Sequence, residues 1–354
     1  DTIEINVEAG ESITCTFTNT QRGAIVIRKE TNPSGSDVFG FTSTSGPSTT
    51  LPASFDVTAG AAGNSYSNLL PGTYTVIEDD PTPAFDLTDI TCIESIVPGP
   101  NDTTVDEATR TATINLDPGE LVTCTYTNTQ RANLTVQKAI TVDFDSTQTV
   151  DSQFDFTSTT LPNASFQLTP TLAATPDTAD FTNLVPGTYD VEEDQLAAVA
   201  NGWALVDASC DDGTDLRTNN FQVDLSAGED VVCTFTNAPL GSATIIKNSV
   251  GGTGLFSYSG TAPFLGLTLD TSVSNPASAD FTNELDPLDN PYIIVEEDPA
   301  PDGFALTGLT CEEFGGTDDQ GNPVADNTTT TPAARRADIN ADYNEQVTCT
   351  FTNT

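Results

Sequence analysis

The segment Leu121–Arg131, LVTCTYTNTQR, recurs along the chain with few changes. Near copies are SITCTFTNTQR from residue 12, DVVCTFTNAPL from residue 230 and QVTCTFTNT from residue 346. In each copy a cysteine, an aromatic residue and an asparagine take alternate positions, which is the period of a β-strand with one buried face. The asparagines are residues 19, 128, 237 and 353, so they are 109, 109 and 116 residues apart. Those spacings are the size of a domain, and the copies mark the ends of successive domains.

Other landmarks return in the same order inside each period. A first apolar strand reads AIVIRK, NLTVQK or ATIIK, and a later one reads PGTYTVIED, PGTYDVEED or NPYIIVEED. An aromatic-led strand ending in cysteine follows, and a turn such as DPGE precedes the closing strand. Period-two alternation with Gly or Pro turns indicates antiparallel strands. We therefore predict an all-β chain of tandem β-sandwiches: residues 23–131, 132–239 and 240–354, with residues 1–22 as the closing strands of an upstream repeat.

Composition narrows the possible partners. The 354 residues include 52 acidic and 10 basic side chains, a net charge of -42, which disfavours nucleic acid and anionic membrane surfaces. The acidity fits a soluble secreted surface, with a cation-binding role as the alternative. Histidine is absent, which removes the usual general base and the commonest zinc ligand. We expect no metal, no cofactor and no membrane contact by this region.

Cysteine usage follows the repeat. Six of the seven cysteines fall as one pair per period, and we predict the disulfides Cys92–Cys124, Cys210–Cys233 and Cys311–Cys349. A metal site is the alternative, but the spacings match no zinc motif. Cys15 is left over.

The lysines carry the most information. The only three in the chain are Lys29, Lys138 and Lys247, at the same place on the first strand of each repeat. Alternation places each lysine on the apolar face of its strand. The same count places three glutamates on an inner face, Glu78, Glu193 and Glu297. The closing strands add Asn128, Asn237 and Asn353, so each sandwich is predicted to bury one lysine, one glutamate and one asparagine.

Burying this trio is costly unless the charges are paired or neutralised. Burial lowers the pKa of a lysine and raises that of a glutamate, which favours a neutral amine beside a protonated carboxyl. Such an amine can attack the asparagine side chain, with the glutamate moving protons, and expel ammonia to leave a Lys–Asn amide. The alternative is a buried Lys–Glu ion pair with the asparagine as a hydrogen-bond partner.

The order of a first-strand lysine, a GTYxVxE glutamate and an FTNT asparagine resembles the B-type repeat domains of Gram-positive collagen-binding adhesins and the pilin domains of Gram-positive bacteria. The resemblance covers all three repeats and the half repeat. It implies a prealbumin-like, inverse immunoglobulin-like sandwich and three isopeptide triads: Lys29, Glu78 and Asn128; Lys138, Glu193 and Asn237; Lys247, Glu297 and Asn353. The disulfide beside the asparagine is not a general feature of that family, and no sortase-type signal is visible.

Two classes of function remain open at the sequence level. The first is a structural shaft, the repeat region of an extracellular surface protein or filament whose partners are neighbouring repeats or other copies in a fibre. The second is an adhesin module that binds a host or matrix ligand through its loops. The shaft is favoured because the features that repeat are the core residues, the crosslink residues and the turns. An enzyme is not expected, because the glutamates would act in a single autocatalytic turnover.

Residues 1–20, DTIEINVEAGESITCTFTNT, match only the last two strands of a repeat. They carry Cys15 and Asn19 but no lysine strand and no second cysteine. Two strands cannot bury an apolar face by themselves. We expect the missing strands, with a lysine and a cysteine, in preceding sequence; strand exchange between subunits is the alternative.

Overall fold

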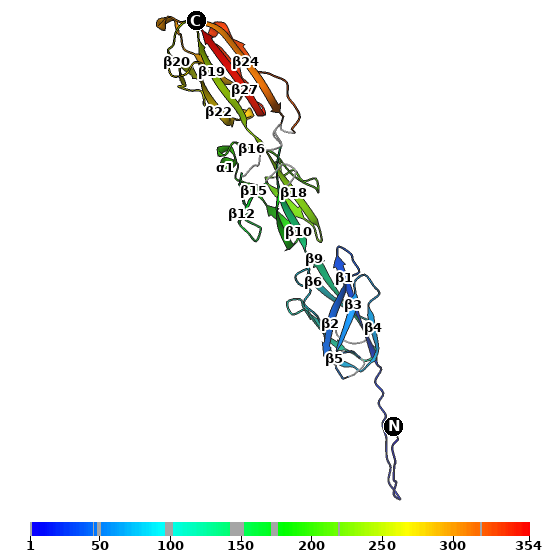
Figure 1. Cartoon of the computed structure of the whole chain (residues 1–354). Helices are drawn as coiled ribbons and strands as arrows, with labels where there is room; N and C mark the ends of the chain where they lie inside the picture. The colour runs from blue at the N-terminus through cyan, green and yellow to red at the C-terminus, as the bar shows by residue number, and fades with distance from the viewer. Residues whose placement is uncertain are drawn as a thin grey trace. The chain divides into compact units, whose positions relative to one another are not determined.

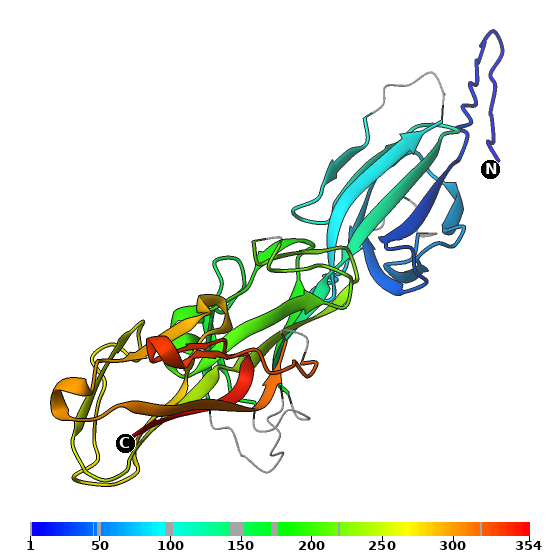
Figure 2. The same ribbon diagram turned by 90° about the horizontal axis from the view of Figure 1, so that it is seen from above.

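The computed structural model describes residues 2–44, 46–47, 51–95, 102–141, 152–170, 176–218, 220–318 and 321–354 (Figures 1 and 2). The chain divides into two compact units, Asp1–Ala132 and Asn133–Thr354. The first unit holds one β-sandwich and the second holds two, so the predicted all-β fold is confirmed. Within the described residues, no helix has the length and apolar character needed to cross a membrane.

The first sandwich is built from two sheets. Its strands are β1 (Gly23–Asn32), β2 (Val38–Thr44), β3 (Ser54–Thr58), β4 (Asn64–Leu69), β5 (Gly72–Glu78), β6 (Phe85–Glu94), β7 (Thr104–Asp106), β8 (Thr111–Leu116) and β9 (Leu121–Gln130). One sheet has the order β4-β1-β9-β6 and the other has the order β3-β2-β5-β8-β7. The closing strand β9 lies between β1, to which it is parallel, and β6, to which it is antiparallel.

Strand alternation builds the core of this sandwich. Along β1, Ile25 and Ile27 are fully buried while Ala24 and Val26 are partly exposed. Tyr74 and Val76 of β5 and Tyr126 of β9 are also fully buried, so the two sheets meet through their inner faces. Every second side chain along these strands is buried. Farther along the same strands, this alternation also places polar residues in the core.

The third sandwich repeats this topology. Its strands are β19 (Gly241–Ser249), β20 (Leu255–Gly260), β21 (Thr268–Asp270), β22 (Ala277–Leu285), β23 (Tyr292–Glu296), β24 (Leu306–Thr317), β25 (Thr329–Thr331), β26 (Arg336–Ile339) and β27 (Tyr343–Asn353). The sheet orders are β22-β19-β27-β24 and β21-β20-β23-β26-β25. Three short 3₁₀ helices, η1 (Pro287–Asp289), η2 (Ala300–Asp302) and η3 (Pro332–Ala334), lie in its connections. The closing strand β27 is again central and parallel to the first strand.

The second sandwich keeps one sheet and divides the other. Its strands are β10 (Ala132–Ile140), β11 (Phe154–Thr157), β12 (Ser165–Leu168), β13 (Asp177–Leu184), β14 (Gly187–Asp190), β15 (Glu192–Glu193), β16 (Trp203–Cys210), β17 (Gln222–Leu225) and β18 (Asp230–Pro239), with the helix α1 (Gln195–Ala200). The intact sheet has the order β13-β10-β18-β16, with β18 parallel to β10. The strand equivalent to β5 is split into β14, which pairs with β17, and β15, which pairs with β11.

The three predicted disulfides are confirmed. Each joins directly opposed residues of the closing strand and its antiparallel neighbour: Cys92–Cys124, Cys210–Cys233 and Cys311–Cys349. The cysteines are 32, 23 and 38 residues apart in sequence. Closing loops of that length stabilises the fold by about 3 to 4 kcal/mol per bridge in the chain-entropy account.

Candidate functional site

The predicted trio of the first sandwich comes together in its core. Lys29 of β1, Glu78 of β5 and Asn128 of β9 have no exposed surface. The Lys29 Nζ lies 3.2 Å from Glu78 Oε1 and donates a hydrogen bond to the carbonyl oxygen of Tyr126. The Asn128 Nδ2 donates to the same Glu78 Oε1 over 2.9 Å. Because β1 and β5 belong to opposite sheets, the carboxyl bridges the two layers of the sandwich.

The second sandwich holds an equivalent trio with a closer amine. The Lys138 Nζ lies 3.2 Å from Glu193 Oε2 and donates to Asn237 Oδ1 over 2.6 Å. The Asn237 Nδ2 donates to Glu193 Oε1, also over 2.6 Å. The amine, the carboxyl and the amide are therefore in direct mutual contact, with at most 1% of any of the three side chains exposed.

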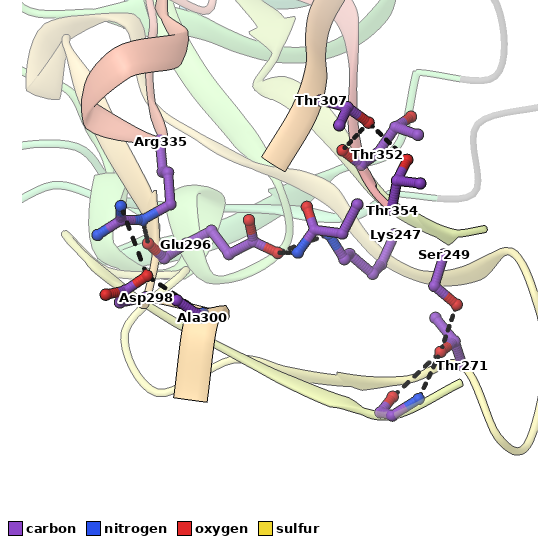
Figure 3. Close-up of polar contacts among 12 residues, drawn as sticks. Lys247, Ser249, Thr271, Glu296, Asp298, Ala300, Thr307, Arg335, Thr352 and Thr354 are labelled. Carbon is purple, nitrogen blue, oxygen red and sulfur yellow. Dashed lines mark hydrogen bonds and ion pairs between the residues drawn. The ribbon is translucent and has the colours of Figure 1, made fainter. Parts of the chain in front are cut away.

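In the third sandwich the glutamate is Glu296. Its Oε1 lies 2.5 Å from the Lys247 Nζ and accepts a hydrogen bond of 2.9 Å from Asn353 Nδ2. Figure 3 shows the side chains of Lys247 and Glu296 pointing toward one another. Both residues and Asn353 are buried.

The prediction of Glu297 is wrong. Glu297 is exposed, and the alternation in β23 buries Tyr292, Ile294 and Glu296 instead. The VEED letters of repeats two and three look equivalent, but they are offset by one position in the fold. A better signal is the tyrosine four residues earlier, because Tyr74 precedes Glu78, Tyr189 precedes Glu193 and Tyr292 precedes Glu296 by that same spacing.

A phenylalanine covers each lysine. The Nζ atoms lie 4.7, 4.3 and 4.3 Å from the ring centroids of Phe39, Phe154 and Phe256. These rings exclude water from the amine, and they come from the strands that follow the lysine strand in each repeat. They were not predicted from the sequence. Phe39 and Phe256 are the first aromatic residues after their lysines, whereas in the second repeat Phe144 comes between Lys138 and Phe154.

Burial shifts the titration of the three lysines and of Glu78 toward their neutral forms. Loss of hydration lowers the pKa of Lys29 to about 8, against the opposing effect of Glu78. Loss of hydration likewise lowers the pKa of Lys138 to about 8 and lowers that of Lys247. It also raises the pKa of Glu78, although Lys29 and Asn128 act in the opposite direction. A transfer of the proton from amine to carboxyl removes two buried charges at once.

Two arginines support the glutamates in the first and third sandwiches. The Nε of Arg110 donates to the carbonyl oxygen of Glu78, whose backbone N–H donates back to the Arg110 carbonyl. Arg335 and Glu296 form the same pair of contacts, and Figure 3 shows the one made by the arginine side chain. Both arginines have a positive φ of 55°. This role could not be predicted from the sequence, because an arginine in a left-handed turn carries no distinctive motif.

Comparison with known proteins identifies the family to which the chain belongs. A family profile described as a prealbumin-like fold domain matches residues 25–130, 136–239 and 243–354, and a second profile with the same description matches residues 1–21. The chain belongs to the family of prealbumin-like fold domains. None of the curated protein sequences compared matches it.

Similar solved structures include two bacterial pilins and one further bacterial protein. The Bacillus anthracis TIE protein is 14% identical, with a TM-score of 0.34, 78% of this chain covered and 45% of that chain spanned. BcpA, the major pilin subunit of Bacillus cereus, is 12% identical, with a TM-score of 0.34 and coverage of 94% and 99%. The major pilin from Streptococcus pyogenes is 15% identical, with a TM-score of 0.23 and coverage of 62% and 99%.

The one-residue offset between Glu296 and Glu297 provides a matched pair of variants. We expect Glu296→Gln to prevent covalent joining of Lys247 to Asn353, because the amide cannot move the proton between amine and leaving group. Glu297→Gln should leave the joining intact, since that side chain is exposed. Tandem mass spectrometry of the peptides containing residues 247 and 353 measures this. Equal yields of the joined peptide from both variants would contradict the assignment of Glu296.

Proposed function

We propose that this chain is the structural repeat region of an extracellular surface protein or fibre, in which each sandwich is stiffened by a disulfide and an internal Lys–Asn amide. The observation that carries the proposal is the threefold occurrence of a buried lysine within reach of a buried glutamate and asparagine. The proposed bonds join Lys29 to Asn128, Lys138 to Asn237 and Lys247 to Asn353.

The chemistry balances without a cofactor. The neutral lysine amine attacks the Cγ carbon of the asparagine side chain, and a new C–N bond forms. The amine loses one proton to the glutamate, and the glutamate delivers a proton to the departing Nδ2, to which it is already hydrogen-bonded in all three repeats. The old C–N bond breaks and ammonia leaves. The glutamate ends as it began, so one carboxyl serves one turnover.

Unpartnered oxygen atoms favour neutral groups over a permanent ion pair. In the first and third repeats Glu78 Oε2, Asn128 Oδ1, Glu296 Oε2 and Asn353 Oδ1 are buried and have no hydrogen-bond partner among the described residues. A buried acceptor without a donor costs about 1 to 3 kcal/mol. A protonated carboxyl supplies one O–H donor for these oxygens. The protonation state that satisfies the core is also the state that permits amide formation.

The positions of the proposed bonds explain what they would do mechanically. In the first repeat the chain enters at the start of β1 and leaves at the end of β9, and these two strands are parallel neighbours. A pull on the two ends therefore shears the pair. An amide between Lys29 and Asn128 would carry the force directly between the strands, so residues 30–127 would bear no load. The Cys92–Cys124 disulfide lies within that protected segment.

Three further features fit a structural role outside the cell. Disulfides persist in oxidising compartments, and each described repeat contains one. The net charge of -42 keeps such a surface soluble. The reactive groups lie in cores with no exposed surface, so they serve the fold itself. Its partners would then be adjacent repeats or other copies in a fibre.

The rate of amide formation should depend on pH through the lysine. Burial lowers the pKa of Lys29 and Lys138 to about 8. The reactive pair, a neutral amine beside a protonated carboxyl, holds as many protons as the ion pair, so its share stays constant until the pair loses its proton above about pH 8. For protein isolated unfolded and then refolded, we expect the rate of ammonia release to be constant just below pH 8 and to fall about tenfold per pH unit well above it. Timed mass spectrometry of the refolding chain measures it. A rate that keeps rising above pH 8 would contradict the role of the protonated carboxyl.

Stretching single molecules tests the mechanical role directly. With disulfides reduced, we expect the unaltered first repeat to extend very little, whereas Glu78→Ala, which cannot form the amide, should release most of a contour of roughly 350 Å. The disulfide must be reduced because it also shortens the extensible loop. If the unaltered chain released the full contour length of a repeat, the proposal that force passes directly from Lys29 to Asn128 would be contradicted.

A further inference from the structure

We propose that Arg110 and Arg335 are positioning residues for amide formation in the first and third repeats, where each arginine fixes the backbone of the glutamate that moves the protons. The inference rests on the proposed function, because it concerns how fast the same lysines and asparagines join. Each arginine binds the main chain of its glutamate, so it acts through that residue. The second repeat has no such arginine and is expected to react without one.

The glutamates lie where the pairing of two strands ends. Glu78 is the last residue of β5, and the pairing of β5 with β8 stops one residue earlier. Glu296 is likewise the last residue of β23, and the pairing of β23 with β26 also stops one residue earlier. On this side of the strand, the main-chain groups of the glutamate need partners from outside the ladder. A residue at the end of a ladder also opens more easily than one inside it.

One arginine supplies both partners. The backbone N–H of Glu78 donates to the carbonyl oxygen of Arg110 over 3.0 Å, and Arg110 Nε donates to the carbonyl oxygen of Glu78 over 3.2 Å. The corresponding distances between Glu296 and Arg335 are 2.9 and 3.1 Å. Two hydrogen bonds from a single residue therefore hold the backbone from which the carboxyl reaches the amine and the amide.

The turns that contain the arginines indicate that the side chain itself is needed. Residues 107–110 and 332–335, EATR and PAAR, connect β7 to β8 and β25 to β26, with the arginine in the last position of each turn. The φ angle is 55° at both arginines. Glycine or asparagine adopts this left-handed conformation with less strain. An arginine at this position in two repeats fits a requirement for the guanidinium and not for the turn alone.

An aspartate two residues after the glutamate accompanies each arginine. Arg335 Nη1 lies 3.9 Å from Asp298 Oδ1, and Figure 3 shows the guanidinium facing both Glu296 and Asp298. The equivalent residue of the first repeat is Asp80, whose pKa is lowered mainly by hydrogen bonds from a nearby threonine and in smaller part by Arg110. The aspartate thus attracts the guanidinium toward the end of the strand that carries the glutamate.

The sequence of the second repeat has neither residue of this pair. Counting back ten residues from the glutamate in the turn before the closing strand gives an arginine in the first and third repeats but Asn219 in the second. Two residues after Glu193 the chain has Gln195 in place of the aspartate. Arg217, the one arginine in the sequence of this repeat, donates to the carbonyl oxygen of Val206 instead. The second repeat is therefore an internal control for the role of the arginine.

The charge and the hydrogen bonds of Arg110 have opposite effects on the reaction. Burial raises the pKa of Glu78, and Arg110 is the weakest of the groups that lower it. The charge alone therefore disfavours the protonated carboxyl that the reaction uses. The hydrogen bonds favour the reaction, because a misplacement of about 1 Å can slow a reaction about 100-fold. Removal of the arginine should slow amide formation if positioning dominates, and should speed it if the charge alone matters.

Arg110→Asn in the full chain tests the positioning role, because asparagine tolerates the left-handed turn and removes the guanidinium. For protein isolated unfolded and refolded at pH 7, we expect the joined peptide of Lys29 and Asn128 to form about tenfold more slowly, while the other two repeats keep their rates. Arg335→Asn should slow only the third repeat. The matched control is Arg28→Asn, which removes a charge from the exposed face of β1 and should change no rate. Timed peptide mapping by mass spectrometry measures all three repeats in one sample.

Amide exchange of the same samples separates positioning from folding. Slow joining in a first repeat that exchanges like the unaltered chain supports the proposal. Joining by Arg110→Asn at or above the unaltered rate, or an equal slowing by Arg28→Asn, would overturn it. If Arg110→Asn exchanges rapidly, Arg110→Gly repeats the test with the residue best suited to the turn, and rapid exchange in both would show a role in folding and also overturn the proposal. An unaltered chain without joined peptides is a separate result, which would remove the proposed function and this inference with it.

Discussion

A primary amine buried beside a carboxyl group in the core of each sandwich is the constraint on which the rest of the structure depends. Lys29, Lys138 and Lys247 have no exposed surface, and a phenylalanine ring covers each amine. Keeping both groups charged in such a place costs several kcal/mol per ion before their attraction offsets it. The proposed proton transfer and amide formation would remove this cost permanently, because the product would have neither the amine nor its charge.

The closing strand at the centre of its sheet carries both the asparagine of the buried trio and a cysteine of the disulfide. β9 is parallel to β1 and antiparallel to β6. It carries Asn128, the proposed partner of Lys29 on β1, and it forms the disulfide with β6. Cys124 and Asn128 lie four residues apart on the same inner face, separated by Tyr126. One strand thus fixes the register of a whole sheet.

Much of this could be predicted from the sequence, since alternation and repetition act locally. The inward lysines and asparagines follow from counting along the strands that carry them, and the cysteine pairs follow from their spacing. The VEED letters point to Glu297 and not to Glu296, because their similarity hides a one-residue shift that depends on how β23 pairs with β20 and β26. The covering phenylalanines and the arginines behind Glu78 and Glu296 depend on contacts between strands far apart in the chain, which no local pattern encodes.

The intact mass of the fully reduced, folded chain tests the central claim most directly. The account predicts a mass lower than that of the unmodified 354-residue sequence by three ammonia molecules, one from each of the three described triads. Reduction of the disulfides beforehand ensures that no other covalent bond is counted. A mass equal to that of the unmodified chain would contradict the account and leave three buried Lys–Glu ion pairs in its place.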